Sequence, residues 1–137
     1  MKVIICGSMS MAKQMLSAGK ELGKIGHTVI LPLRTSEYAN GKLDIETSTE
    51  STENKIKHDL IRDYFNKISE GDSILVINET KSGIENYIGG NSFLEMGFAH
   101  ILKKSIYLLN PIPDMIYSDE IKAMTPVVLN GDLTRIK

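Results

Sequence analysis

The order of the short apolar segments along this chain predicts an α/β fold, in which a parallel sheet of about five strands carries helices on both faces. Two observations predict it. Segments rich in β-branched residues alternate with stretches whose apolar residues recur at helical spacing. The 137 residues, 42% of them hydrophobic and 24% charged, also have the size and balance of a single domain that spans residues 1–137.

Five segments have the composition of strands that are buried in a sheet. Each is a short run made mainly of β-branched and other apolar residues. The last of the five is the weakest. The predicted strands span residues 3–6, 28–31, 73–77, 106–109 and 126–129.

Helical patterns fill most of the stretches between these strands. The first lies between the first two strands, and Gly26 supplies a stop at its C-terminal end. Its apolar residues recur at helical spacing, and its methionines are expected to pack in the core: Met11, Met15, Ala18, Leu22 and Ile25. Further helices are predicted over residues 56–68, 93–101 and 118–124, and the second of these is apolar on most sides.

Residues 35–54 lack this periodicity and are rich in Ser, Thr, Glu and Asn. They are expected to form a mobile polar surface loop and not a second domain. A loop of this length inside a compact domain is often a lid over a site. An inert, solvated insertion explains the composition nearly as well. A second, shorter polar loop is predicted over residues 79–90.

Alternating strands and helices imply right-handed crossovers in a three-layer flavodoxin-like or Rossmann-like arrangement. Ligands of such sheets bind beyond the carboxyl ends of the strands, where the strand order reverses. We therefore expect the site residues in the segments that follow the strands, namely residues 7–10, the polar stretch after Leu31, residues 78–92 and residues 110–114.

Composition argues against several other classes of protein. The net charge of −1 gives no electrostatic basis for binding nucleic acid, and no apolar run approaches the roughly 20 residues that cross a membrane. A single cysteine, Cys6, cannot form an internal disulfide, so the reducing cytoplasm is the expected compartment and a core position is its expected role. The three histidines lack the spacing of metal ligands, and no metal is expected.

The turn Gly7-Ser8-Met9-Ser10 follows the first strand and precedes a helix. Backbone N–H groups and the hydroxyls of Ser8 and Ser10 could bind an anion or a sugar there. A tight turn with Ser10 as a helix cap explains the residues equally well. The turn lacks the glycine pattern of dinucleotide-binding loops and the Gly-Lys-Ser/Thr ending of nucleotide-triphosphate loops, so neither function gains support.

A second glycine-rich turn leads into the helix that begins near residue 92. Gly89 and Gly90 would let the backbone approach a ligand, and Asn91 and Ser92 add polar groups. Ser92 and Glu95 also have the spacing of a capping box, in which the serine caps the helix and the glutamate three residues later reaches back. The residues by themselves favour this capping role of Glu95 over catalysis.

Residues 91–99, Asn-Ser-Phe-Leu-Glu-Met-Gly-Phe-Ala, followed by Lys-Lys-Ser-Ile-Tyr at 103–107, resemble the signature of the nucleoside 2-deoxyribosyltransferase superfamily. That signature is a glycine-rich turn, then Glu-x-Gly-x-Ala, then a basic residue and a strand. Residues 6–9, Cys-Gly-Ser-Met, are similar to the corresponding loop of the 2'-deoxynucleoside 5'-phosphate N-hydrolases, a branch of the superfamily. The resemblance covers most of the chain in element order, and its specific part is the segment around Glu95.

The resemblance implies an enzyme that cleaves or transfers the N-glycosidic bond of a nucleoside or nucleoside 5'-monophosphate, with Glu95 as the nucleophile. It implies a second carboxylate from the helix before the third strand, for which Asp63 and Asp59 are candidates, although each is displaced from the family spacing. Asp72, which opens that strand, fits the same layout. A homodimer without metal or redox cofactor is also implied, with the helix over residues 93–101 at its interface.

One departure from the family pattern concerns substrate recognition. Family members often carry Asp or Ser six residues before the nucleophile, where this chain has Gly89, and Asn91 comes four residues before it. Recognition of the sugar hydroxyl or 5'-phosphate is therefore expected to differ. This departure leaves open an alternative function, a non-catalytic sensor that binds a nucleotide-like ligand in the same cleft.

Overall fold

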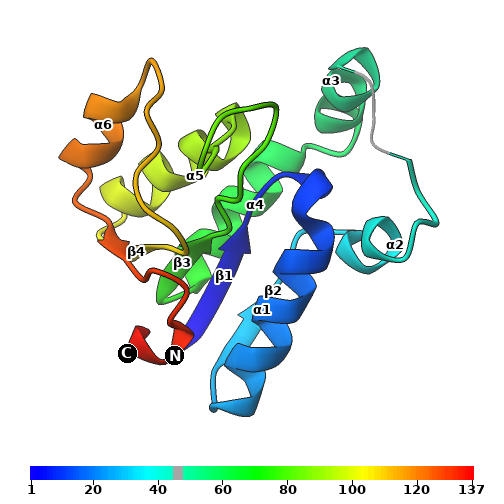
Figure 1. Ribbon diagram of the computed structural model, residues 1–137. Helices are drawn as coiled ribbons and strands as arrows, with labels where there is room; N and C mark the ends of the chain where they lie inside the picture. Colours follow the sequence, from blue (N-terminus) through cyan, green and yellow to red (C-terminus); the bar gives the residue numbers. More distant parts are fainter. Residues whose placement is uncertain (45–47) are drawn as a thin grey trace.

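The computed structural model describes residues 1–44 and 48–137, and it contains the predicted parallel sheet (Figure 1). The strand order is β2-β1-β3-β4-β5, and every neighbouring pair is parallel. Each strand lies within one residue of a predicted segment, so the α/β fold is confirmed. The strands are β1 (Lys2–Cys6), β2 (Thr28–Ile30), β3 (Ser73–Val76), β4 (Ser105–Leu108) and β5 (Val127–Val128).

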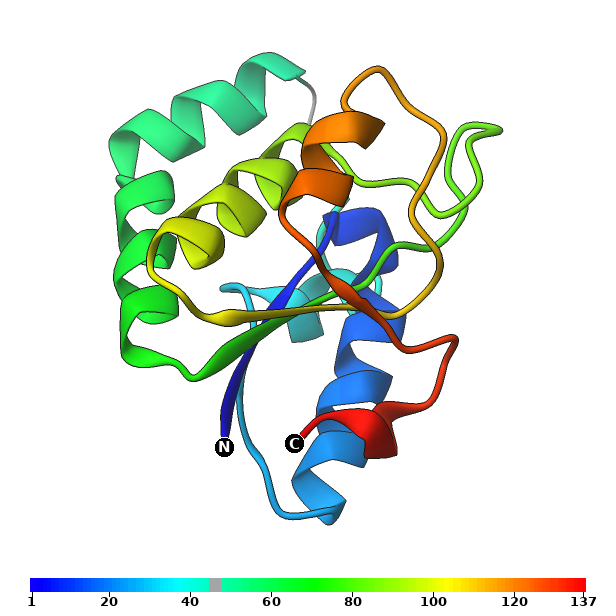
Figure 2. The ribbon, with the colours of Figure 1, turned by 90° about the vertical axis from the view of Figure 1, so that its left-hand side faces the viewer.

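Helices cover both faces of this sheet, and Figure 2 shows α1 on one side and α4 and α5 on the other. The helices of the described chain are α1 (Ala12–Lys24), α2 (Thr35–Ala39), α3 (Ser48–Lys57), α4 (Leu60–Glu70), α5 (Gly90–Ile101) and α6 (Ser118–Ala123), with 3-10 turns η1 (Met9–Met11) and η2 (Leu133–Arg135).

Alternation along β1 divides the core into two layers. Val3 and Ile5 pack with α1 and the C-terminal segment, whereas Ile4 and Cys6 pack with α4, α5 and α6. All four side chains are fully buried, which confirms the core position predicted for Cys6. The central strand thus brings the Cys6 thiol to the side of the sheet where α4 and α5 lie.

The strand order reverses between β1 and β3, because the chain passes from β1 to β2 on one side and returns to β3 on the other. Ligands of such sheets bind at the carboxyl ends of the strands near the point of reversal, so the turns that follow the strands are the candidate site segments. Two short elements complete the sheet region as predicted: α6 lies within residues 118–124, and β5 within residues 126–129.

The segment 35–54 differs from the predicted loop. It contains all of α2 and most of α3, and residues 45–47 of the segment lie outside the described chain. Periodicity did not reveal α3 because few of its residues are apolar, but it carries Glu50 in its first turn and Lys55 and Lys57 in its last, which suits the helix dipole. The mobility of this segment stays a prediction.

The predicted helix over residues 56–68 is two helices. Asp59 adopts a left-handed conformation with φ of 50°, and this residue separates α3 from α4. Ile56 lies on α3 and Leu60 on α4, yet they are four residues apart, which is the spacing of neighbours on a single helix. The apolar pattern therefore gave no sign of the break. The chain changes direction at this break, and α3 lies beyond the carboxyl ends of the strands (Figure 1).

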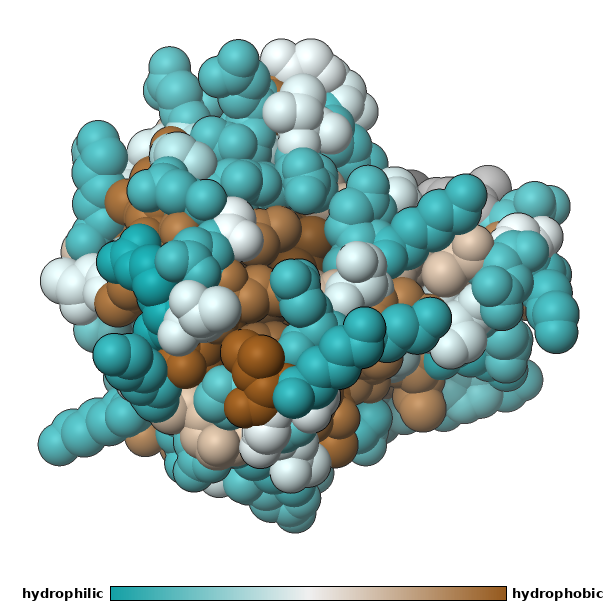
Figure 3. Space-filling view, turned by 60° about the horizontal axis from the view of Figure 1, so that its bottom comes forward, coloured by the Kyte–Doolittle hydropathy of each residue, from teal (hydrophilic) through white to brown (hydrophobic). Residues whose placement is uncertain are grey.

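The surface seen from the amino ends of the strands is mixed in character. Figure 3 shows hydrophobic side chains in the middle of this face, with hydrophilic side chains around them.

None of the helices in the described residues is long and apolar enough to span a membrane.

Candidate active site

A pocket of about 160 Å³ lies at the carboxyl ends of β1 and β2, between the turns that follow these strands and the helices α3, α4 and α5. Charged side chains from three helices line it: Lys55 from α3, Asp63 and Lys67 from α4, and Glu95 from α5. Most of the other lining side chains are apolar, among them Met9, Leu33, Leu60, Ile61, Leu94 and Phe98. The pocket therefore combines a largely apolar wall with a few charged and polar groups, as ligand sites commonly do.

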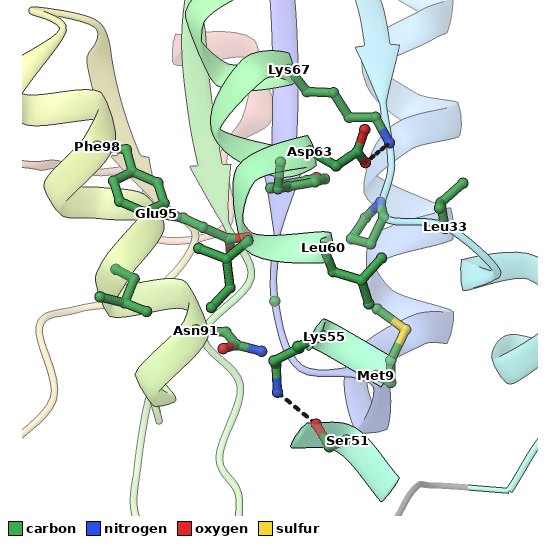
Figure 4. A pocket seen from close by; sticks show the side chains of 15 residues that line it. Met9, Leu33, Ser51, Lys55, Leu60, Asp63, Lys67, Asn91, Glu95 and Phe98 are labelled. Atoms are coloured by element: carbon green, nitrogen blue, oxygen red, sulfur yellow. Dashed lines mark hydrogen bonds and ion pairs between the residues drawn. The ribbon is translucent and has the colours of Figure 1, made fainter. Parts of the chain in front are cut away.

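Glu95 reaches from α5 toward α4 inside this pocket (Figure 4). Its side chain is partly accessible from the pocket and otherwise surrounded by protein. Burial raises the pKa of Glu95 to about 8, while hydrogen bonding with the Cys6 thiol and the positive charge of Lys55 act in the opposite direction. A carboxyl group with so strong a preference for its neutral form, lining a cleft, is a candidate functional group.

The capping role considered for Glu95 is absent. Helix α5 begins at Gly90 with Gly89 as its N-cap, and no side chain caps it. Ser92 lies inside the first turn of the helix and is only 4% exposed. The capping-box prediction is wrong because the helix starts earlier than that motif requires, which places Glu95 more than one turn beyond the cap.

Of the two aspartates considered as the second carboxylate, Asp63 shares the pocket with Glu95. Its Oδ2 atom lies 3.1 Å from the Nζ atom of Lys67, one turn later on α4. Asp59 lies outside the pocket, is exposed, and accepts a hydrogen bond of 2.6 Å from Arg62. The structure therefore brings Asp63, and not Asp59, into the pocket that holds Glu95.

Asp72 lies at the opposite end of the sheet. It precedes β3, and its Oδ2 atom accepts a hydrogen bond of 2.6 Å from the backbone N–H of Lys2 at the start of β1. This contact ties two neighbouring strands together at their amino ends. Asp72 thus has a structural role, far along the strands from the pocket.

In the turn after β1, Gly7 and Met9 line the pocket, but Ser8 and Ser10 do not. The Ser8 side chain caps η1 by accepting a hydrogen bond of 3.4 Å from the Ser10 backbone N–H. Lys81 also donates to the Ser8 hydroxyl at 3.0 Å. The predicted cap at Ser10 is wrong, because the serine two positions earlier does the capping.

Among the predicted ligand-binding residues of the segment 89–92, Asn91, in the first turn of α5, lines the pocket. A side chain at Gly89 would lie 3.3 Å from the ring of Tyr87, so that glycine permits a close approach within the protein. Gly90 opens α5, and Ser92 is buried. The candidate binding residues Ser8, Ser10, Gly89, Gly90 and Ser92 therefore lie outside the pocket lining, and their roles toward a ligand stay predictions.

Lys55, Ser51 and Lys67 line the pocket although the sequence analysis did not select them. Lys55 donates a hydrogen bond of 2.5 Å to the Ser51 hydroxyl, one turn earlier on α3. No motif marks these three residues. Their only signal is the pairing of Lys67 with Asp63 four residues earlier, a spacing that places both on one helix face.

Two buried groups near Glu95, Cys6 and the pocket-lining Tyr64, hold their protons. Burial and the neighbouring Glu95 raise the pKa of the Cys6 thiol well above its usual value. Burial also raises the pKa of Tyr64, whose hydroxyl donates to the backbone carbonyl of Ile5. Both groups are therefore neutral at physiological pH and contribute polarity without charge.

The described residues contain no group of three or more side chains that could hold a metal ion. Helix α5 exposes two apolar side chains, Leu94 at 46% and Ile101 at 79%. The expected homodimer through this helix stays a prediction, and light scattering would test it.

Neither the family models nor the curated proteins include a match to the chain. Among solved structures, it is similar to the 2-deoxyribosyltransferase of the psychrotolerant bacterium Bacillus psychrosaccharolyticus, described as a biocatalyst for the synthesis of nucleosides. The two share 20% sequence identity with a TM-score of 0.54, over 85% of this chain and 77% of that one. The similarity shows a shared fold, which is the fold that the resemblance in the sequence implied.

Proposed function

We propose that this protein cleaves or transfers the N-glycosidic bond of a nucleoside or nucleoside 5'-monophosphate, with Glu95 as the nucleophile. The observation that carries the proposal is the pocket at the carboxyl ends of the strands, which Glu95 and a second carboxylate, Asp63, both line. The fold shared with a 2-deoxyribosyltransferase supports the same class of substrate.

The proposed reaction has two steps. In the first, a carboxylate oxygen of Glu95 bonds to the anomeric carbon of the sugar while the carbon–nitrogen bond breaks and its electron pair goes to the base, which takes up a proton. In the second, water or another base attacks the anomeric carbon and releases Glu95. Positive charge develops on the sugar in both steps, and a carboxylate in a desolvated pocket stabilises that charge.

Asp63 and Lys67 are the groups proposed to assist. Their ion pair of 3.1 Å lies on α4, and both side chains line the pocket that Glu95 also lines. A carboxylate here can orient the sugar or the attacking water and exchange a proton with it. The apolar side chains of Ile61, Leu94 and Phe98 complement the hydrophobic faces of a base.

The proposed role of Glu95 predicts how kcat/KM depends on pH. Glu95 attacks only when ionised, and with a pKa of about 8 it is largely protonated at neutral pH. We expect kcat/KM to rise with pH up to about 8, as the carboxylate forms. A rate that instead falls through this range would indicate that Glu95 acts as a proton donor and would contradict its role as nucleophile.

The direct test is to incubate the protein with a panel of deoxynucleosides, ribonucleosides and their 5'-monophosphates. Chromatography then measures the free base that is released. Glu95→Gln should reduce the rate of release by about 100-fold or more, because it removes the nucleophile and keeps the volume. Glu120→Gln, at an exposed position on α6, is the matched control and should react as the wild type does. Base release that is equally fast in Glu95→Gln contradicts the mechanism, and tight binding of a panel member without any turnover favours the sensor.

A further inference from the structure

The ionised form of Glu95 is disfavoured by its surroundings, so the pocket needs a source of positive charge. Cys6 beneath it is a neutral thiol, and Ile61, Leu94 and Phe98 beside it are apolar. A carboxylate in such a setting loses its hydration without gaining an equal number of compensating dipoles. A nearby cation would recover part of that loss.

Two lysines line the pocket, and their environments differ. The Nζ atom of Lys67 contacts Asp63 Oδ2 at 3.1 Å and lies 5.6 Å from the ring centroid of Tyr64. Its charge is therefore largely offset by a carboxylate. Lys55 instead donates to a neutral hydroxyl, that of Ser51, at 2.5 Å. A hydroxyl fixes the position of an ammonium group and leaves its charge in place.

We propose that Lys55 is a positioning residue for the reaction described above: held on α3 by Ser51, its ammonium group stabilises the ionised carboxylate of Glu95 across the pocket. The inference rests on the proposed function, since it concerns the protonation state that this function requires. Figure 4 shows Lys55 and Ser51 at the end of the pocket where Asn91 also lies. The charge of Lys55 is one of the influences that lower the pKa of Glu95.

The other titratable groups around Glu95 supply less net positive charge. Cys6 on β1 and Tyr64 on α4 are neutral, because burial raises the pKa of each. Asp63 on α4 carries a negative charge that Lys67 offsets. These contributions leave Lys55 on α3 as the cation of the described lining whose field acts most fully on Glu95.

The test is a pH titration of Glu95 that is monitored by NMR. Glutamate labelled with carbon-13 at the side-chain carboxyl gives the signals, and the signal of Glu95 is assigned as the one missing from Glu95→Gln. In Lys55→Met the midpoint should lie higher than in the wild type by at least about half a pH unit, because a favourable charge is lost while an unbranched side chain of similar length is kept. Lys55→Arg should restore a midpoint near that of the wild type.

Lys57→Met is the matched control, since it removes the same charge from an exposed position of the same helix and should leave the midpoint unchanged. An unchanged midpoint in Lys55→Met overturns the inference, as does an equal change in Lys57→Met, which would indicate an effect of net charge alone. The titration needs no turnover, so it separates this inference from the proposed function. If the protein releases base, the rising limb of its pH profile should move with the midpoint.

Discussion

The two walls of the pocket differ in how they are attached to the rest of the molecule. Helices α4 and α5 pack on the sheet through fully buried side chains such as Ile68 and Met96. Helix α3 packs on α4, and its one large apolar residue, Ile56, is 77% exposed. The carboxylates Asp63 and Glu95 thus stand on the wall that the core holds, whereas Lys55 stands on the wall that it does not. The proposed reacting groups therefore lie on helices that the core holds, whereas Lys55, the cation proposed to act on Glu95, lies on a peripheral helix.

The largest expected difference between the two walls is in how much their apolar side chains contribute to the free energy of unfolding. Met96→Ala is expected to lower the free energy of unfolding by about 2–5 kcal/mol, because it opens a cavity in a packed core. Ile56→Ala should change it by less than about 0.5 kcal/mol, since the side chain is mostly exposed and alanine favours the helix. Urea denaturation of both variants would measure this contrast. Similar losses in the two variants would mean that α3 is anchored as firmly as α5.

The pH dependence of stability tests the environment of Glu95 on the inner wall. Its pKa is raised on folding from 4.5 to about 8, so between these values the folded protein binds a proton that the unfolded chain has released. Folding is therefore favoured most at low pH by this group, and its contribution is lost as pH rises toward 8, by on the order of 2–4 kcal/mol.

Unfolding of the wild type and of Glu95→Gln at pH 5 and pH 8 would measure that loss, because the other titrating groups cancel in the difference between the two proteins. The wild type should lose more stability than the variant over this interval. Equal losses in both would show that the folded protein leaves the pKa of Glu95 near its ordinary value. Glu120→Gln provides the control for removal of an exposed carboxylate.

Asp63 on α4 and Asp59, which directly precedes α4, allow a matched comparison of activity. Asp63→Asn should lower kcat/KM by about 100-fold, if this carboxylate orients substrate or transfers a proton. Asp59→Asn should leave it within about twofold, because Asp59 lies outside the pocket beside Arg62. Steady-state kinetics on the best substrate of the panel would decide. A larger loss for Asp59 than for Asp63 would reverse their assignments.

The wall that packs on the sheet could be predicted from the sequence, whereas the wall formed by α3 could not. Strands and sheet-packed helices leave a period in the apolar residues, so β1 and α1 were found within one residue of their bounds, and α5 was found with its start three residues late. The position of Glu95 beyond the strand ends followed from that order. Helix α3 has almost no apolar face, and neither its helical state nor the approach of Lys55 to the pocket leaves such a period. Cap geometry also escaped prediction, because Ser92 and Glu95 have the capping spacing but the helix begins at Gly90.

Mass spectrometry of the protein after incubation with a 2'-deoxy-2'-fluoro nucleoside or nucleotide would show directly whether Glu95 is the nucleophile. Fluorine beside the anomeric carbon disfavours positive charge there. Cleavage of the bond between the sugar and the enzyme is therefore slowed, and the adduct persists. We predict an adduct of the sugar on the peptide that contains Glu95, and none on the Glu95→Gln protein. An adduct on a different residue, or one that forms equally on Glu95→Gln, would contradict the account.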